Sequence, residues 1–400
     1  MKKIIQILHH SLTPFNLGVD PRFYEGDWHV RLAKELVKRT KEYEVECWRP
    51  EKTFTKVFVR KDKNGITYKI FPSTCWTYAL EYSLPLLKNL QMELAKHEKM
   101  IVHLHGFYNF HANLISLFIH KRCPVVAQSH GGYPLLFEFK KNIQAQFLHP
   151  QRFPFLFTQQ ISFSNIDRFF VLSKEEEEYF SKLYGKERVR IQPMGIDLEE
   201  FKPIDKNEAR ERLHLDKDRP YVLYVGRLHE SKGIQYLIEA LKYVKGENPY
   251  LKLILVGDGP HKEKFKAMSK SMGIGENVTF TGWVKPYELL LYYSAVDIFV
   301  FPSLDEPWGV VVLEALACQK PVITTFTGCV PKLADALKDG LFIIPKASAL
   351  PIKKAISQIL LRVEEISRKI SREKIRKYSW DDIIKNTLNT YEELLYEYYN

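Results

Sequence analysis

Apolar runs alternate with amphipathic stretches along almost the whole chain, and this alternation constrains the fold more than any other feature. The runs are rich in Val, Ile and Leu and lie at 102–104, 124–127, 168–172, 221–225, 251–256, 297–300 and 321–324. Helical periodicity surrounds them, for example at 28–39 and 174–184. Strands that are apolar on both faces must be covered on both faces. The pattern therefore predicts an α/β fold of parallel sheets with helices on either side.

The chain is long enough for two such sheets. Its 400 residues are comfortable for two domains, each with its own core. Residues 197–220 are charged, lose periodicity and contain two prolines, so we expect the linker region there. The predicted domains are two Rossmann-like, doubly wound units, over 1–200 and 201–378, followed by a helix at 379–400 that folds back on the first domain. Ligands of open α/β sheets bind at the carboxyl ends of the strands, so two such domains facing one another would enclose a cleft.

The first ten residues resemble a signal peptide only briefly. Their apolar stretch is short and is interrupted by Gln6, His9 and His10, so it is predicted to be a first β-strand. No segment reaches the roughly 20 apolar residues that a membrane span requires. We therefore expect a cytoplasmic protein.

The charge and the cysteines narrow the possible partners. Lys and Arg number 59 against 48 Asp and Glu, a net charge of +11, which attracts nucleotide phosphates, anionic membranes or nucleic acid. No nucleic-acid-binding signature accompanies this charge, so a nucleic-acid partner is not expected. The five cysteines are odd in number and form no C-x-x-C pair, which argues for reduced thiols and against a zinc site.

Two carboxylates, Glu306 and Glu314, bracket a segment that changes from a Pro/Gly loop into an apolar run. Pro307 is expected in the first turn of a helix, and Gly309 leaves the helix start open to a ligand. Carboxylates on either side of a bare helix N-terminus suit a ligand with hydroxyls at both ends and negative charge in the middle. A nucleotide sugar is such a ligand. The alternative is a loop acid beside a partly buried helix acid, with no ligand.

Two cations follow an earlier strand of the same half. In Val225–Gly233, Gly226 permits a tight turn, while Arg227 supplies a planar fork and Lys232 a point charge. This pair suits a diphosphate leaving group. A solvated basic loop is the alternative.

His130 directly follows a buried strand of the first half and precedes two glycines. The glycines permit close approach to a ligand, and a neutral imidazole can hydrogen-bond a sugar hydroxyl. The alternative is a structural histidine.

Together these segments resemble the family-four retaining glycosyltransferases, which have the two-domain GT-B fold. The resemblance covers most of the chain and is densest from Pro193 to Pro345. Besides the Gly-Arg-Leu…Lys-Gly and Glu-seven-Glu segments, the motifs that carry it, in the family's order, are Pro193-Met194-Gly195-Ile196-Asp197 with Phe201, Val256-Gly257-Asp258-Gly259-Pro260, Val278–Val284 and Lys320-Pro321-Val322.

The resemblance implies how the diphosphate would be held. Arg227 and Lys232 would bind it and stabilise the charge as it leaves, and the backbone amides of Gly309 and Val310 would complete the cradle. The family needs no metal, and two cations with a helix dipole fit that absence. We therefore expect no metal and no cofactor besides the donor substrate.

The resemblance also implies contacts to the rest of the donor. Glu306 would contact the transferred sugar and Glu314 the ribose diol. Trp283 and Val284 would border the base, and His130 would lie near the sugar from the first domain.

Several positions depart from the family's pattern. The glycine-rich first loop is reduced to Gly18 and Gly26, and Gly18 is the residue predicted to approach the donor there. Gln319 and Cys329 each stand where glycine is frequent, and Lys332 replaces a commonly acidic residue. These changes could alter the preference for sugar or base.

Two weaker patterns remain. Asp216-Lys217-Asp218 has the D-x-D form of a metal–diphosphate site, but it lies in a polar stretch and is predicted to be a solvated turn. Residues 133–163 are rich in aromatic and basic side chains. They could lie on a membrane surface and reach a lipid-linked acceptor, or form the acceptor wall and pack on their own domain.

The predicted function is transfer of a hexose from a UDP- or GDP-sugar to a hydroxyl of a saccharide, lipid-linked or small-molecule acceptor, with retention and without a metal. Three alternatives stay open. Two share the fold, a nucleotide-sugar epimerase and a glycosyl phosphorylase. The third is a non-catalytic basic protein that binds anions.

Overall fold

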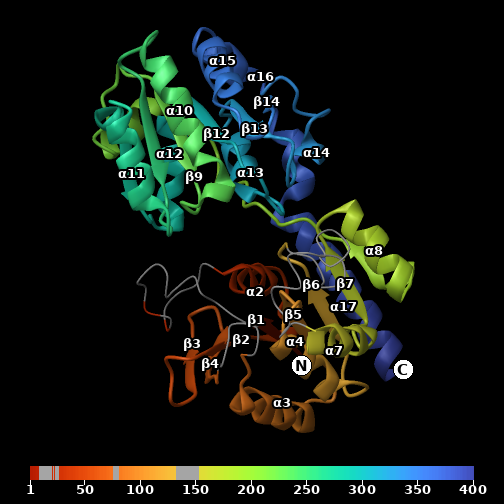
Figure 1. Ribbon diagram of the computed structural model, residues 1–400. Coiled ribbons are helices and arrows are strands. Elements are labelled where there is room, and N and C mark those ends of the chain that lie inside the picture. Colours follow the sequence, from red (N-terminus) through yellow and green to blue (C-terminus); the bar gives the residue numbers. More distant parts are fainter. Residues whose placement is uncertain (9–19, 21, 23–26, 75–80, 132–152) are drawn as a thin grey trace. The chain divides into compact units, whose positions relative to one another are not determined.

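The computed structural model describes residues 1–8, 20, 22, 27–74, 81–131 and 153–400. The chain forms two compact units (Figure 1). Unit 1 consists of Met1–Pro193 and Asp381–Asn400, and unit 2 of Met194–Trp380. The chain therefore passes between units after Pro193 and after Trp380, where the sequence analysis placed boundaries at 200/201 and 378/379.

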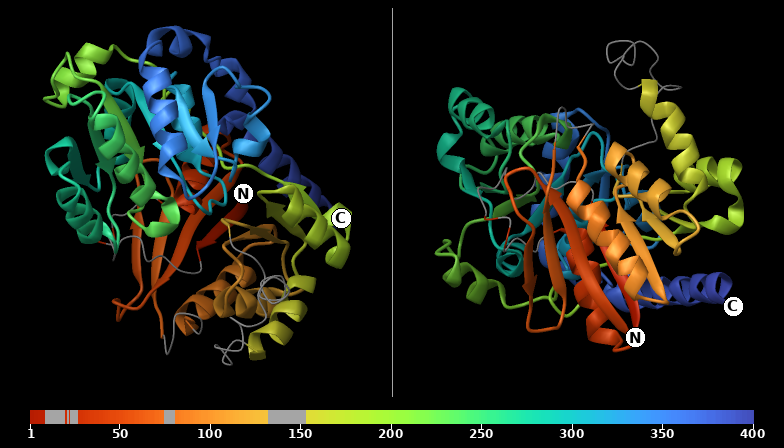
Figure 2. Two further views of the ribbon diagram at one scale, coloured as in Figure 1. Left: turned by 45° about the horizontal axis from the view of Figure 1, so that its top comes forward. Right: turned by 90° about the horizontal axis from the view of Figure 1, so that it is seen from below.

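Unit 1 is built on an eight-stranded sheet in the order β3-β4-β2-β1-β5-β6-β7-β8. Its strands are β1 (Lys2–Leu8), β2 (Tyr43–Glu51), β3 (Phe58–Lys61), β4 (Thr67–Pro72), β5 (Met100–His105), β6 (Val125–Gln128), β7 (Arg168–Val171) and β8 (Val189–Ile191). All neighbours pair in parallel except β3, which is antiparallel to β4 at the edge. Figure 2 shows these strands, coloured red to yellow, as one layer.

The helices of unit 1 begin where the sequence offers caps. They are α2 (Trp28–Arg39), α3 (Leu84–Lys96), α4 (Phe110–Ile119), α7 (Phe153–Ser164), α8 (Lys174–Tyr184) and α17 (Trp380–Tyr399). The side chains of Ser83, Asn109 and Ser173 cap α3, α4 and α8 by accepting from backbone amides of the first turn. The central strands are buried along their length and pack with these helices into one core that contains Val102, Leu104, Phe169 and Phe180.

The C-terminal helix α17 packs on unit 1. The side chain of Gln192, just after β8, donates to Thr387 at 3.0 Å, and Arg168 on β7 pairs with Glu397 at 2.9 Å. Tyr391 is fully buried. The last twenty residues thus complete the domain that the first residues begin.

A closed ring of four charges ties β1, β2, β4 and α3 together at the end of the sheet away from the carboxyl ends of β1 and β5. Lys3 contacts Glu93 at 2.6 Å and Glu46 at 2.9 Å, and Lys69 contacts Glu46 at 2.9 Å and Glu93 at 3.2 Å. All four side chains are at most 11% exposed. Burial alone would raise the pKa of Glu93, but the hydrogen bond from Lys3 and the charge of Lys69 outweigh it and lower the pKa to about 2.

We predict that Glu93→Gln lowers the free energy of unfolding at pH 7 by on the order of 3 kcal/mol, because it leaves two lysines with one carboxylate. The native pKa lies below the unfolded value, so the stabilisation is present above about pH 4 and is lost as the pH falls toward 2. Urea unfolding from pH 7 downward should show the gap between wild type and variant narrowing below about pH 4. Exposed Glu98 is the control: Glu98→Gln should stay close to wild type, and an equal loss in both variants would contradict the role of the ring.

Unit 2 is built on a six-stranded, fully parallel sheet in the order β11-β10-β9-β12-β13-β14. Its strands are β9 (Tyr221–Val225), β10 (Lys252–Val256), β11 (Val278–Gly282), β12 (Ile298–Phe301), β13 (Val322–Thr325) and β14 (Leu341–Ile344). Its helices are α9 (Lys206–Arg212), α10 (Ile234–Lys245), α11 (Lys262–Ser271), α12 (Leu289–Ala295), α13 (Val310–Ala317), α14 (Val330–Leu333), α15 (Ala349–Leu360) and α16 (Val363–Lys369). The order runs outward from β9 in one direction and from β12 in the other, so right-handed crossovers place helices on both faces, as predicted.

The predicted linker at 197–220 is wrong. All of it belongs to unit 2, and it contains α9, which packs beside α12. Arg210 is 3% exposed, donates to the carbonyl of Ala295 at 2.8 Å and pairs with Asp297 at 3.0 Å. Most charges of the segment are exposed, and the helix is anchored by the buried ion pair of Arg210, which sequence periodicity does not detect. Among the described residues, no helix is both long and apolar enough to cross a membrane.

Candidate functional site

The predicted cations and carboxylates of unit 2 lie at the point where its strand order reverses. Strands β9 and β12 are neighbours, and the chain runs outward from them in opposite directions. The loops after the two strands therefore separate at the carboxyl edge of the sheet, which is where ligands of open α/β sheets bind. The first loop contains Arg227 and Lys232, and the second contains Glu306 and Gly309.

Direct hydrogen bonds and a close backbone approach join these two loops. The amide of Leu304 donates to the carbonyl of Ser231 at 2.8 Å, and Lys232 Nζ donates to the carbonyl of Asp305 at 3.1 Å. Gly233 has φ +70°, and a Cβ atom there would lie 2.0 Å from the carbonyl oxygen of Pro302. Only glycine therefore allows the first loop to pass so close to the second.

Lys232 and Glu306 form the charged centre of the site. Lys232 Nζ lies 2.9 Å from Glu306 Oε2, and the two side chains are 20% and 14% exposed. The amide of Trp308 also donates to Glu306 Oε1 at 3.4 Å. The pair is therefore held in place from two loops while part of each side chain still reaches solvent.

Arg227 supplies a second cation, which forms no ion pair with a carboxylate of the described residues. Its residue is exposed, and its side chain makes no hydrogen bond or ion pair with another described residue. Its backbone is fixed, because the hydroxyl of Tyr224 donates to its carbonyl at 3.0 Å. Arg227, Lys232 and Glu306 together carry a net positive charge, which suits an anion.

The helix after Glu306 starts later than predicted. Helix α13 begins at Val310, so Pro307 lies in the loop and not in the first turn. Gly309 is the N-cap, with φ +75°, and no side chain caps the helix. In the part of the chain that the structure describes, the amides of Gly309, Val310 and Val311 donate to no protein acceptor, whereas Val312 donates to Gly309. The helix start is bare, and such amides with the helix dipole favour an anion.

The residues predicted to contact the nucleoside are Glu314, Trp283 and Val284. Glu314 lies on α13, is 3% exposed and accepts a hydrogen bond from the hydroxyl of Tyr293 at 2.8 Å. Trp283 and Val284 follow β11, and Trp283 is 39% exposed. A role for Glu314 at a ribose, and for Trp283 and Val284 at a base, stays a prediction.

In unit 1, His130 follows β6 as predicted, and a carboxylate that the sequence analysis missed holds its segment. Ser129 donates to Glu176 Oε1 at 2.6 Å, and the other oxygen of Glu176 accepts from the amide of Leu172 at 2.7 Å. The amide of Gly131 donates to the Ser129 hydroxyl at 3.3 Å. Glu176 also occupies the third position of α8, three residues after the Ser173 cap, and that Ser-x-x-Glu spacing was the available signal.

Gly18 and residues 132–152 lie outside the described residues. The structure therefore leaves the predicted approach of Gly18 to the donor, and most of the predicted acceptor or membrane segment 133–163, as predictions.

Comparisons with known proteins match this architecture in both halves. The family model "Glycosyltransferase Family 4" matches residues 29–200, and the model "Glycosyl transferases group 1" matches residues 205–379. The chain belongs to the group 1, family 4 glycosyltransferases.

Two relatives are similar to this chain over 55% and 75% of its length. An uncharacterized glycosyltransferase of Methanocaldococcus jannaschii is 30% identical over 230 residues, which are 55% of this chain and 58% of the relative. The alpha-monoglucosyldiacylglycerol synthase of Streptococcus pneumoniae is 25% identical over 75% of this chain and 68% of the relative. The chain thus spans little more than half the length of the first relative and about two thirds of the second.

Solved structures support the fold over nearly the whole chain. The sucrose-phosphate synthase of Thermosynechococcus elongatus has a TM-score of 0.78 at 21% identity and covers 99% of this chain and 100% of its own. Anabaena HepE in complex with UDP-glucose has a TM-score of 0.69 at 16% identity, with coverage of 98% and 100%. The GT-B fold predicted from the sequence is confirmed.

The departures of this glycosyltransferase from its family's pattern have structural consequences. Gln319 has φ +55° just after α13, where its amide donates to Leu316 at 3.0 Å and the amide of Lys320 donates to Ala315 at 2.9 Å. This left-handed helix end normally favours glycine, and Gln319 is partly compensated by a hydrogen bond from its side chain to Ile370. Lys332 lies over the ring of Trp308, with Nζ 4.9 Å from the centroid.

The D-x-D sequence is a solvated turn, as predicted. The amide of Asp218 donates to Asp216 at 3.0 Å, and Asp216 pairs with Arg219 at 2.8 Å. Within the described ranges, no group of three or more His, Cys, Asp or Glu residues could hold a metal ion.

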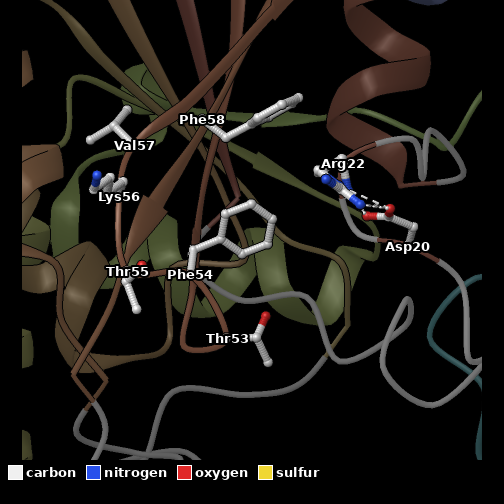
Figure 3. Close-up of a pocket in the computed structure, with 8 residues that line it drawn as sticks. All are labelled: Asp20, Arg22, Thr53, Phe54, Thr55, Lys56, Val57 and Phe58. Carbon is white, nitrogen blue, oxygen red and sulfur yellow. Dashed lines mark hydrogen bonds and ion pairs between the residues drawn. The ribbon is translucent and has the colours of Figure 1, made fainter.

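Unit 1 also has an open hollow of about 450 Å³ beside the connection from β2 to β3 (Figure 3). It is lined by Asp20, Arg22, Thr53, Phe54, Thr55, Lys56, Val57 and Phe58. Arg22 pairs with Asp20 at 2.6 Å, so these two charges satisfy one another. None of the lining residues was predicted to bind the donor.

We predict that Gly233→Ala disrupts the joined loops of unit 2. Gly273 offers a matched control, because its φ is +71° and a Cβ atom there would have open space. Gly273→Ala should cost about 1 kcal/mol of stability from the backbone alone. Gly233→Ala should cost at least ~2 kcal/mol more, because its Cβ meets the Pro302 carbonyl. Denaturant unfolding measures both, and equal losses would contradict the close approach.

Proposed function

We propose that this chain transfers a hexose from a UDP- or GDP-sugar to a hydroxyl of a saccharide, lipid-linked or small-molecule acceptor, with retention of configuration. The observation that carries the proposal is the meeting of Lys232, Glu306 and the bare start of α13 at the reversal point of the unit 2 sheet. Family membership and the similarity to HepE in complex with UDP-glucose support it.

The diphosphate would bind where positive charge is gathered. Arg227 would reach it from the loop after β9, and the amides of Gly309 and Val310 would donate to it from the start of α13. Lys232 is already held by Glu306, and a phosphate oxygen would compete for the same ammonium hydrogens. These groups would stabilise charge that develops as the diphosphate leaves, which is the main requirement of such a transfer.

Glu306 would accept hydrogen bonds from hydroxyls of the transferred sugar. Its contact with Lys232 links the two ends of the reacting bond, because the carboxylate faces the sugar and the ammonium faces the phosphate. A carboxylate that accepts from a sugar hydroxyl and from Lys232 at once would orient the sugar relative to its leaving group.

The transfer would proceed on one face of the sugar. The bond between the anomeric carbon and the phosphate oxygen breaks, and the acceptor oxygen bonds to the same carbon from the same side. The acceptor's proton passes to the departing phosphate oxygen, so no other base is needed. Glu306 is engaged with Lys232, which makes it a poor nucleophile.

The fixed cations would replace a metal ion at the diphosphate. We therefore propose a metal-independent enzyme. We further propose that it acts in the cytoplasm, as expected from its sequence. A membrane lipid is one acceptor class to include in tests, since a relative is named as an alpha-monoglucosyldiacylglycerol synthase.

The first test is a thermal-unfolding panel of UDP, GDP, ADP and their hexose derivatives, run with and without EDTA. A ligand that binds the native state stabilises it and so raises the melting temperature. The stabilisation is about 2.7 kcal/mol at a ligand concentration of 100 times the Kd. We expect a UDP or GDP series to stabilise the protein equally with and without EDTA. Loss of the shift in EDTA would refute metal independence, and no shift with any nucleotide would refute the proposal. Release of a sugar phosphate that requires inorganic phosphate would favour a phosphorylase instead.

The second test separates chemistry from binding. Glu306→Gln should lower the turnover of the donor identified in the panel by roughly 100-fold, because the sugar loses a charged acceptor. Binding of the nucleoside diphosphate should not weaken, because that ligand lacks the sugar and the neutral side chain of Glu306→Gln holds Lys232 less tightly. Neighbouring Asp305 is exposed, and Asp305→Asn should leave both quantities unchanged. Unaltered turnover in Glu306→Gln would contradict the assignment.

A further inference from the structure

Two histidines of unit 2 contact the backbone of residues 226–233, the loop after β9 that carries both cations and is here called the cation loop. His229 lies within this loop, and His261 lies just before α11. The amide of Ser231 donates to His229 Nδ1 at 3.1 Å, and the amide of Glu230 donates to His261 Nδ1 at 3.2 Å. The two rings lie beside one another, with their centroids 4.6 Å apart.

The contacts with His261 tie the cation loop to the loop after β10. The backbone amide of His261 donates to the carbonyl of Leu228 at 3.1 Å, and the amide of Leu228 donates to the carbonyl of Asp258 at 2.9 Å. His229 in turn caps the short 3-10 turn Glu230–Lys232. The two rings therefore help to set the backbone path on which the cations are mounted.

The direction of these hydrogen bonds determines the state of each ring. A backbone amide can only donate, so Nδ1 of both rings must offer a lone pair. A ring that accepts at Nδ1 carries its hydrogen on Nε2 and is neutral. Protonation would place a second hydrogen on Nδ1, where it would face the hydrogen of the amide. The charged form of either ring therefore cannot make its contact with the loop.

The surrounding charges favour the neutral rings. They belong to Arg227, Glu230, Lys232, Asp258, Lys262, Lys264 and Glu306. Each of the three carboxylates Glu230, Asp258 and Glu306 is already paired with a lysine. Burial, the neighbouring His261 and the charge of Arg227 lower the pKa of His229, against a smaller opposing effect of Glu230.

We propose that His229 and His261 are positioning residues, which as neutral acceptors hold the cation loop in the conformation that binds the donor diphosphate and release it when they take up a proton. The proposal rests on the proposed function, in which Arg227 and Lys232 bind the diphosphate. A proton on Nδ1 turns an attraction to the amide into a repulsion, so the ring must turn away and the amide loses its partner.

The direction of the pH dependence follows from the neutral state of the rings. The pKa of His229 in the folded protein lies below its ordinary value of 6.5. Its hold on the cation loop is therefore complete above about pH 6.5 and is lost as the pH falls below that value. Donor binding should weaken over the same range.

The hydrogen bonds can be tested without a ligand by 15N NMR of the full-length chain with labelled histidine. The signals of the two rings are assigned by their absence in His229→Asn and His261→Asn. At about pH 8 we expect an unprotonated Nδ1 and a protonated Nε2 on both rings. A ring protonated on Nδ1, alone or as one of two tautomers in exchange, would overturn the proposal.

The effect on the donor is measured by calorimetric titration with UDP-glucose and GDP-glucose between about pH 8 and pH 5.5. The diphosphate of these probes is esterified at both ends and keeps its charge over this range, so a change in affinity reports on the protein. The Kd of the probe that binds should rise at least about fivefold on acidification, which corresponds to about one backbone hydrogen bond. Unchanged or tighter binding at low pH would overturn the proposal, since the rings would then act as added charges or not at all.

Asparagine and leucine variants separate positioning from charge. The Oδ1 atom of asparagine can accept where Nδ1 does, and it does not titrate. The double variant His229→Asn with His261→Asn should bind the probe within about twofold of wild type at both pH values. The double variant His229→Leu with His261→Leu offers no acceptor and should bind at least about fivefold more weakly at about pH 8. A wild-type pH dependence in the asparagine variant, or equal binding by the two double variants, would overturn the proposal.

His214→Asn is the matched control. His214 is exposed and precedes β9, whereas the cation loop follows it, and its φ of +53° suits asparagine. This variant should keep the pH dependence of the wild type, and loss of that dependence would overturn the assignment to His229 and His261. If neither probe binds at about pH 8 while the tautomers are as expected, the proposed function fails and the hold on the cation loop stands. If a probe binds at about pH 8 but its affinity does not fall on acidification, the proposed function stands and the positioning role fails.

Discussion

The contact between the loops after β9 and β12 is the constraint on which the site in unit 2 depends. Gly233 lies against the carbonyl of Pro302, and the Leu304 amide donates to the Ser231 carbonyl, so the two loops are joined to one another. Lys232 and Glu306 come from different loops, and their 2.9 Å contact exists only because the backbones are joined. The strand order places both loops at the reversal point, and the glycine lets them touch.

The two units reach a similar result by different means. In unit 2 the functional groups are charged, partly exposed and fixed by backbone contacts. In unit 1 the segment of His130, the predicted ligand contact, is fixed by hydrogen bonds to buried side chains. Ser129 and Glu176 hold its backbone, and His105 holds its ring. Buried polar groups of this kind are stable only when each has a partner of the right donor or acceptor type.

The sequence predicted the strands of unit 2 well and the boundaries of the unit less well. Runs such as 221–225 and 322–324 are strands because buried parallel strands must be continuously apolar. Residues 197–220 were mistaken for a linker because a helix anchored by Arg210 and Asp297 lacks an apolar stripe. Pro307 suits a first helical turn, yet α13 starts three residues later, because Gly309 adopts the left-handed conformation and breaks the backbone path between them. The sequence did not point to Glu176 or His105, because each makes its contact with a residue distant along the chain. Glu176 contacts Ser129, and His105 contacts His130.

By itself, the sequence determined the α/β architecture, the order of the motifs and the chemical types that carry the site: two cations, two carboxylates, a glycine before a helix and a histidine after a strand. These are local properties, set by side-chain chemistry and hydrophobic period. Tertiary structure alone decided which of these groups are joined. It paired Lys232 with Glu306 and left Arg227 exposed, buried Glu314 against Tyr293, and joined Gln6 to His105 and Tyr391 by hydrogen bonds. The physical reason is that hydrogen bonds and ion pairs act over about 3 Å, and only packing of the sheet brings residues hundreds of positions apart to that distance.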